Sequence, residues 1–298
     1  MTFRVDVLKK ISFLLCLIWV FSLFTYAQAQ PDSFKPEPSR AEIKLIAERE
    51  TVIAGEVFFA GIDFKLAPGW HIYWRNPGDS GLPPEMDWHS LKHAEAEEFL
   101  WPAPEAFALS EADLLDYGYQ GGVVLPFQVG VTPQAEGEII LAGQLDYLIC
   151  KDICIPETIQ LAMRLPVSEA SIPNQAEGEQ IAANLARTPQ RFDGEACWVA
   201  REDKWQLSLA PEGWRPSVRS IRFFPFENHI RPSAPQIWTQ GSHGFTLDLI
   251  SLSNTLSPKK LAGIVVLKGG SKPVQALLIE APKCTQIVPN TAGNAPLR

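Results

Sequence analysis

The sequence has little basic charge, a single long apolar run and none of the compact motifs that mark common enzymes. Its 26 Lys and Arg against 34 Asp and Glu give a formal net charge of −8, which disfavours binding to nucleic acid or an anionic membrane surface. We find no glycine-rich phosphate loop, no Ser/His/Asp hydrolase arrangement and no acid pair at recognisable spacing. These absences leave the cysteines as the main candidates for chemistry.

The long apolar run lies at the start of the chain. Three basic residues come before residues 11–26, which are almost wholly apolar, and Ala27-Gln28-Ala29 offers small residues at cleavage spacing. We therefore expect residues 1–29 to be a signal peptide, whose removal takes three basic residues and one acidic residue and changes the net charge from −8 to about −10. The alternative is an uncleaved leader that anchors the protein to the inner membrane.

The rest of the chain is long enough for two domains, and its apolar residues alternate. Period-two alternation with Pro- and Gly-rich turns predicts antiparallel strands in an all-β sandwich fold. It occurs in the first half at residues 58–66, 141–149 and 159–165, and in the second half at residues 205–209 and 245–249. An Ala-rich stretch containing Ile181 and Leu185 predicts a short helix between the halves.

These patterns divide the chain into successive segments. We expect a linker at 30–40, a first β-sandwich at 41–168, a linker with a short helix at 169–189, a second β-sandwich at 190–285 and a disordered tail at 286–298.

Four cysteines remain once Cys16 leaves with the leader: Cys150, Cys154, Cys197 and Cys284. An exported chain meets an oxidising compartment, but four cysteines allow three pairings. Spacing favours a short pair, Cys150–Cys154, and a long-range pair, Cys197–Cys284. The long-range bond would close most of the second sandwich and stabilise it by roughly 4 kcal/mol in the chain-entropy model, so we interpret it as structural.

The short pair, Cys150-Lys151-Asp152-Ile153-Cys154, lies between two predicted strands. Three intervening residues let the chain double back and bring the sulfurs together. Such a short loop constrains the unfolded chain little, so its entropic benefit is small and the pair suits reversible exchange. A static clip at a β-turn is the alternative, and spacing alone does not choose between them.

Several separated motifs occur in an order that resembles one known family. They are Trp70-His71-Ile72-Tyr73-Trp74-Arg75-Asn76-Pro77-Gly78-Asp79-Ser80-Gly81-Leu82-Pro83, Phe99-Leu100-Trp101-Pro102, Tyr117-Gly118-Tyr119, Leu125-Pro126, Tyr147-Leu148-Ile149-Cys150 and Cys154-Ile155-Pro156-Glu157. Residues 40–168 resemble the amino-terminal periplasmic domain of the disulfide reductase DsbD, and more closely that of its relative ScsB, which is linked to copper tolerance. The second half resembles the companion β-domain of some ScsB-type chains.

This resemblance implies an immunoglobulin-like sandwich with a redox dithiol, a thiol–disulfide oxidoreductase in the broad sense that needs no cofactor. Cys154 would form the mixed disulfide with a partner, and Cys150 would resolve it. Electrons would come from a membrane-embedded or thioredoxin-like donor and pass to oxidised periplasmic proteins. The chain lacks the multi-span membrane domain and any Cys-x-x-Cys segment, so the donor would be a separate protein.

A cap loop with an aromatic residue shields the dithiol in the family. The corresponding stretch here is about Ser110 to Tyr119, which would place Tyr117 or Tyr119 over the sulfurs. Its sequence does not reproduce the family cap, and the gap between the cysteines is shorter than in the best-known DsbD domains. Trp70 and His71 are further candidates for partner contact, although aromatic residues such as Trp70, Tyr73 and Trp74 usually pack in a β-protein.

A second hypothesis is a non-enzymatic binding module for copper or a client protein, with Cys150–Cys154 as a structural clip. His71, His89, His93 and Met86 match no firm metal-binding spacing, and we expect no metal site. The client stays open among apocytochrome c maturation, copper-stress repair and general disulfide reduction.

Overall fold

The structure is a computed structural model of the 298-residue chain. It describes residues 39–108, 113–201, 204–212, 218–253, 258–269 and 275–284. The predicted signal peptide, the linker up to residue 38 and the tail lie outside the described residues, as do the first three residues of the predicted cap, 110–112.

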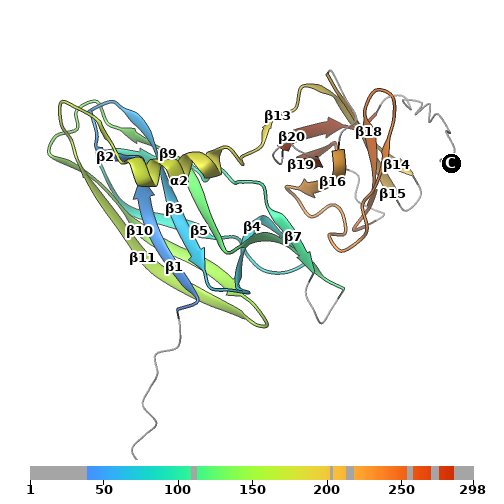
Figure 1. Cartoon of the computed structure of the whole chain (residues 1–298), viewed down its shortest axis with the longest axis horizontal. Helices are drawn as coiled ribbons and strands as arrows, with labels where there is room; N and C mark the ends of the chain where they lie inside the picture. The colour runs from blue at the N-terminus through green and yellow to red at the C-terminus, as the bar shows by residue number, and fades with distance from the viewer. Residues whose placement is uncertain are drawn as a thin grey trace, which may run out of the picture. The chain divides into compact units, whose positions relative to one another are not determined.

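The first half forms an immunoglobulin-like β-sandwich of two facing sheets (Figure 1). One sheet has the order β1 (Ala41–Ala47), β3 (Val57–Leu66), β9 (Gly122–Val131), β6 (Ala94–Ala96). The other has the order β11 (Cys154–Pro166), β10 (Glu138–Cys150), β4 (His71–Gly78), β8 (Leu115–Gln120), β7 (Glu105–Ala108), and β5 (Glu85–Lys92) also pairs with β10. The short strands β2 (Arg49–Thr51) and β12 (Ile172–Pro173) pair separately.

Alternation along the strands builds the core between these sheets. On β3, Phe58, Ile62 and Phe64 point inward and are buried, and on β10 Leu141, Leu145 and Ile149 do the same. Successive side chains of a strand point to opposite faces, so the residues between them lie on the outer faces. The all-β prediction is therefore confirmed, and the outer face of the β10–β4–β8 sheet is left available for a site.

The segment between the halves contains the helix α2 (Gln175–Leu185). Asn174 caps its N-terminus by accepting a hydrogen bond from the backbone N–H of Glu177. Ile181 is fully buried against Ile46 and Val124, which holds α2 on the sheet that contains β3 and β9 (Figure 1). Among the residues that the structure describes, no helix is both long and apolar enough to cross a lipid bilayer.

The second half contains two more sheets. One has the order β13 (Gln190–Arg191), β20 (Gln275–Pro282), β19 (Lys260–Gly269), β16 (Val218–Pro225). The other has the order β14 (Gly194–Arg201), β15 (Lys204–Pro211), β18 (Phe245–Ile250), β17 (Ile237–Gln240). Trp205, Leu207 and Leu247 are buried with Phe223 and Val265 in a core of their own, so this half also has a hydrophobic centre between its sheets.

The sheet of β16 and β19 is buried on both faces. Phe223 and Val265 face the second core, whereas their neighbours Phe224, Ile264 and Val266 join the core cluster of the first sandwich. Strands buried on both faces have continuous apolar runs in place of alternation. Phe223-Phe224 and Ile264-Val265-Val266-Leu267 are such runs, and they indicate that the two sandwiches share an apolar contact.

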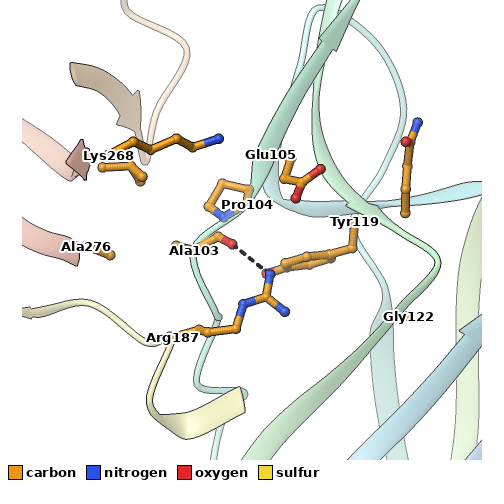
Figure 2. A pocket seen from close by; sticks show the side chains of 10 residues that line it. Ala103, Pro104, Glu105, Tyr119, Gly122, Arg187, Lys268 and Ala276 are labelled. Atoms are coloured by element: carbon orange, nitrogen blue, oxygen red, sulfur yellow. Dashed lines mark hydrogen bonds between the residues drawn. The ribbon is translucent and has the colours of Figure 1, made fainter. Parts of the chain in front are cut away.

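The linker after α2 is fastened to the first sandwich. The backbone N–H of Ala103 donates to the carbonyl of Arg187 at 2.8 Å, and the Arg187 guanidinium donates to the Ala103 carbonyl at 3.5 Å. Figure 2 shows these residues beside Tyr119 at a cavity of about 300 Å³ that Lys268 and Ala276 of the second half also line. None of the described residues that line this cavity is a cysteine.

Candidate functional site

The Cys150–Cys154 pair lies at the turn of the β10–β11 hairpin. Cys150 is the last residue of β10, Cys154 is the first of β11, and the two are register partners with their Cα atoms 4.1 Å apart. Their sulfurs are joined in a disulfide. Lys151 N donates to Ile153 O at 3.1 Å, which closes the tight turn.

The two cysteines differ sharply in exposure. Cys150 is 1% exposed, whereas Cys154 is an exposed residue and Ile153 beside it is 67% exposed. Cys150 is buried because it is also the register partner of His71 on β4, so a strand covers each side of it, while β11 is an edge strand. A visiting thiolate therefore has access to the bond from the Cys154 side.

A tyrosine hydroxyl contacts both sulfurs. The Tyr73 hydroxyl on β4 donates to Cys150 Sγ at 3.0 Å and lies 3.3 Å from Cys154 Sγ. Burial of the ring is the main cause that raises the pKa of Tyr73 to about 12; the Ser80 hydrogen bond opposes this rise, and the nearby negative charge of Asp116 contributes to it. The hydroxyl therefore stays protonated near neutral pH and keeps its proton to donate to the Cys150 sulfur or to the Asp116 carboxylate beside it.

The loop after β4 covers the Tyr73 ring. Gly81 has φ +86°, and a Cβ added there would lie 2.1 Å from Tyr73 Cζ. Only glycine fits this position, because it has both a positive φ and a close approach to the ring. Ser80 beside it donates through N and Oγ to Asp116 Oδ1 at 3.1 and 3.0 Å, which fastens the loop to β8.

Two buried ionisable side chains lie on the same outer face. Asp116 is fully buried, and burial raises the pKa of its carboxyl even though Ser80 hydrogen bonds oppose the shift. His71 is 3% exposed, and burial lowers the pKa of its imidazole, which favours the neutral ring. His71 Nε2 lies 3.9 Å from Asp116 Oδ2 and has no hydrogen-bond partner among the residues that the structure describes.

The positions of the predicted cap residues differ from expectation. Tyr117 and Tyr119 do not lie over the sulfurs, because β8 directs both side chains into the core of the first sandwich. Tyr119 donates to the Pro102 carbonyl at 2.7 Å, and Tyr117 packs edge-on against Phe224 at 4.9 Å. The tyrosine at the disulfide is Tyr73. Its ring is buried, as expected for an aromatic residue of a β-protein, and its hydroxyl contacts the two sulfurs.

The other predicted contact residues lie beside the hairpin. His71 shares a face with Cys150, as cross-strand partners do. Trp70 is half-buried against the core, and the Arg40 guanidinium lies 5.6 Å from its ring centroid while donating to Glu157 on β11 at 3.2 Å. Trp70 thus packs at the base of the dithiol hairpin and does not touch a sulfur in any described contact.

The second pair of cysteines forms a bond of a different kind. Cys197 on β14 is bonded to Cys284 just after β20, so the bond joins the two sheets of the second sandwich. The Cys284 N–H also donates to the Trp198 carbonyl at 2.8 Å. No ionisable side chain or tyrosine hydroxyl contacts these sulfurs in the described hydrogen bonds.

Sequence reasoning missed the roles of Tyr73, Ser80 and Asp116. Tyr73 reaches the disulfide through the pairing of β4 with β10, and Asp116 with its partner Ser80 reaches it through the pairing of β4 with β8; a single sequence reveals neither pairing. One signal was available: period-two spacing places Tyr73 on the same face of its strand as His71. Among the described residues, no group of three or more His, Cys, Asp or Glu is arranged to hold a metal ion.

The fold and the site define a class: a β-sandwich domain whose exposed hairpin carries a disulfide under a tyrosine hydroxyl. Comparison with known families gives the same class. Residues 42–166 match the family described as "Thiol:disulfide interchange protein DsbD, N-terminal". The matched segment is the first sandwich with its dithiol, so the resemblance found in the sequence is confirmed for that domain.

A solved structure extends the likeness over both sandwiches. The N-terminal periplasmic domain of ScsB from Proteus mirabilis aligns with a TM-score of 0.59 at 19% identity, covering 84% of this chain and 96% of that chain. At this identity the match establishes the fold. The human Desmocollin-1 ectodomain aligns over 85% of this chain and 39% of its own with a TM-score of 0.18 at 11% identity, which supports no argument. No curated protein sequence matches this chain.

Proposed function

We propose that the protein is a periplasmic thiol–disulfide interchange protein that relays reducing equivalents through Cys150 and Cys154. The observation that carries this proposal is the asymmetry of the bond: an exposed Cys154 joined to a buried Cys150, with a protonated tyrosine hydroxyl donating to the buried sulfur. The match to the interchange family supports the reaction class, and the periplasmic origin of the ScsB domain supports the location.

Reduction of the disulfide follows from this geometry. A thiolate of the donor attacks Cys154 Sγ, the bond between Cys154 and Cys150 breaks, and Cys150 leaves with the electron pair as a thiolate. The Tyr73 hydroxyl lies 3.0 Å from that sulfur and stabilises the developing charge. A second thiolate of the donor then attacks the donor sulfur of the mixed disulfide and releases Cys154, so two electrons pass to this protein.

The client is reduced by the reverse steps. The Cys154 thiolate attacks a client disulfide and forms a mixed disulfide, releasing one client thiolate. Cys150 then attacks Cys154 Sγ, which releases the second client thiolate and restores the intramolecular bond. We propose a membrane-embedded or thioredoxin-like protein as the donor and oxidised periplasmic proteins as the clients, with no cofactor beyond the disulfide.

Single cysteine variants test this assignment. With reduced thioredoxin as the donor and a disulfide-bonded peptide as the client, Cys154→Ser should lose exchange completely, because its remaining thiol is buried. Cys150→Ser should attack the client and accumulate a mixed disulfide through Cys154, which mass spectrometry detects. Exchange at the wild-type rate in both variants contradicts the proposal. A mixed disulfide that forms only in Cys154→Ser would reverse the two roles.

A further inference from the structure

The strand that carries Tyr73 contains a bulge that is also in contact with the second sandwich. Tyr73 pairs with Gly118 on β8, but the next pair is Gly78 with Asp116. Four residues of β4, 74–77, therefore lie opposite the single residue Tyr117. Residues in a bulge lose ladder hydrogen bonds, so their conformation depends on other contacts.

Both ends of this bulge belong to the dithiol site. Tyr73 at its start places its hydroxyl against the two sulfurs. Gly81, three residues past its end, lies against the Tyr73 ring, and Ser80 bonds to the buried Asp116. A shift of the bulge would therefore move the tyrosine and its cover together.

The second sandwich adds a hydrogen bond to the middle of this bulge. Asn76 is 3% exposed; its Nδ2 donates to the Pro225 carbonyl at 2.8 Å, and its Oδ1 accepts from the Gly78 N–H at 3.1 Å. The Asn76 side chain thus links the end of β16 in the second sandwich to the end of the bulge in the first.

Aromatic contacts flank this hydrogen bond. The Trp74 ring lies 6.1 Å from Phe224 and 5.9 Å from Phe226 between centroids, and the Arg75 guanidinium lies 4.3 Å from the Phe226 centroid. Trp74 is fully buried and Phe224 is 3% exposed, so this contact is a packed interior. Three consecutive residues of the bulge are thereby engaged by the segment Phe224-Pro225-Phe226.

We propose that the second sandwich is a positioning element for the redox site. Phe224-Pro225-Phe226 holds the β4 bulge so that the Tyr73 hydroxyl stays within hydrogen-bond distance of Cys150 and Cys154. This inference rests on the proposed interchange function and assigns a role to the half of the chain that carries no dithiol. A thiolate accepts a stronger hydrogen bond than a disulfide sulfur, so accurate placement of Tyr73 favours the reduced form.

The test compares two phenylalanines of the second sandwich in the full chain. Phe226 is half-buried and contacts the bulge, whereas Phe192 is half-buried against the second core. In dithiothreitol redox buffers, Phe226→Ala should move the Cys150–Cys154 equilibrium towards the disulfide by threefold to tenfold. The reduction potential of the pair would then be more negative by up to about 30 mV. Phe192→Ala should leave that equilibrium unchanged while lowering the unfolding midpoint.

A double-mutant cycle separates positioning from general loosening. In a Tyr73→Phe background there is no hydroxyl to place, so adding Phe226→Ala should produce no further redox shift. Asn76→Ala should shift the redox equilibrium in the same direction as Phe226→Ala. If the Phe226→Ala protein is unstable, Phe226→Leu is the milder variant. Equal effects of Phe226→Ala and Phe192→Ala, or full additivity with Tyr73→Phe, overturn the inference.

The redox equilibrium needs no partner protein, so it decides this inference independently of the relay. A wild-type protein that fails to exchange with thioredoxin removes the proposed function. A wild-type protein that exchanges, with a Phe226→Ala equilibrium equal to wild type, removes only the positioning role.

Discussion

The two sandwiches each contain one disulfide, and the surroundings of the two bonds differ in nearly every respect. Cys150–Cys154 spans a four-residue separation at the end of an edge hairpin, with one exposed cysteine and a tyrosine hydroxyl at the sulfurs. Cys197–Cys284 spans 87 residues and joins two sheets. The comparison shows how position in a β-sandwich separates a bond suited to exchange from a bond suited to stability.

The largest difference should appear in unfolding. Replacing Cys197 and Cys284 together by serine should cost about 4 kcal/mol of unfolding free energy, because the long loop regains its freedom in the unfolded chain. The matched double variant at Cys150 and Cys154 should cost about 2 kcal/mol or less, since its loop is short. Urea unfolding of both proteins checks the prediction, and equal losses would show that loop length does not govern these bonds.

The tyrosine contact should affect exchange more than stability. Tyr73→Phe keeps the ring under Gly81 and removes only the hydroxyl. We expect thiol exchange to slow roughly tenfold, because that factor corresponds to the free energy of one hydrogen bond to a charged group. Because the pKa of Tyr73 is about 12, the wild-type advantage should persist across neutral pH.

Tyr119→Phe is the matched control for this variant. Its hydroxyl also makes a buried hydrogen bond, to the Pro102 carbonyl, but does not contact a sulfur in any described bond. It should lower the unfolding free energy by about 1 kcal/mol and leave the exchange rate unchanged. If Tyr73→Phe exchanges as fast as Tyr119→Phe, the Tyr73 hydroxyl has no role in thiol exchange.

A smaller effect should appear in the pH dependence of stability. Burial raises the pKa of Asp116 above its ordinary 3.8, so in this pH window the folded state binds more protons than the unfolded chain. This carboxyl therefore lowers the unfolding free energy progressively as pH rises from about 3.8 through its folded pKa.

Asp116→Asn removes this titration, so the unfolding free energy should fall less with rising pH than in wild type. Unfolding midpoints measured from pH 3.5 to 7 give the comparison, and Asp248→Asn in the second sandwich is the matched control. A wild-type slope that persists in Asp116→Asn would assign the pH dependence to another group.

Strand alternation made much of the fold predictable. Phe58, Ile62 and Phe64 follow a simple period of two, and all three are buried. The sheet of β16 and β19 did not follow this rule, since Phe224 and Ile264 face the first sandwich while Phe223 and Val265 face the second. Its continuous apolar runs were the available signal of burial on two sides.

The site was only partly predictable because its contacts cross between strands. The hairpin cysteines are only four positions apart in sequence and could be recognised, whereas Tyr73 lies 77 residues before Cys150. The prediction for Tyr117 and Tyr119 was wrong because alternation tells which residues share a face but not which face is inward. The buried positions of both tyrosines follow from the pairing of β8 with β4.

The most direct test of the account is a redox titration of the wild-type protein in dithiothreitol buffers, with alkylation and mass spectrometry to follow each cysteine pair. We predict that Cys150–Cys154 opens at a potential above about −300 mV while Cys197–Cys284 stays closed. A potential for Cys150–Cys154 well below that value, as low as the potential of Cys197–Cys284, would identify it as a static clip and contradict the relay.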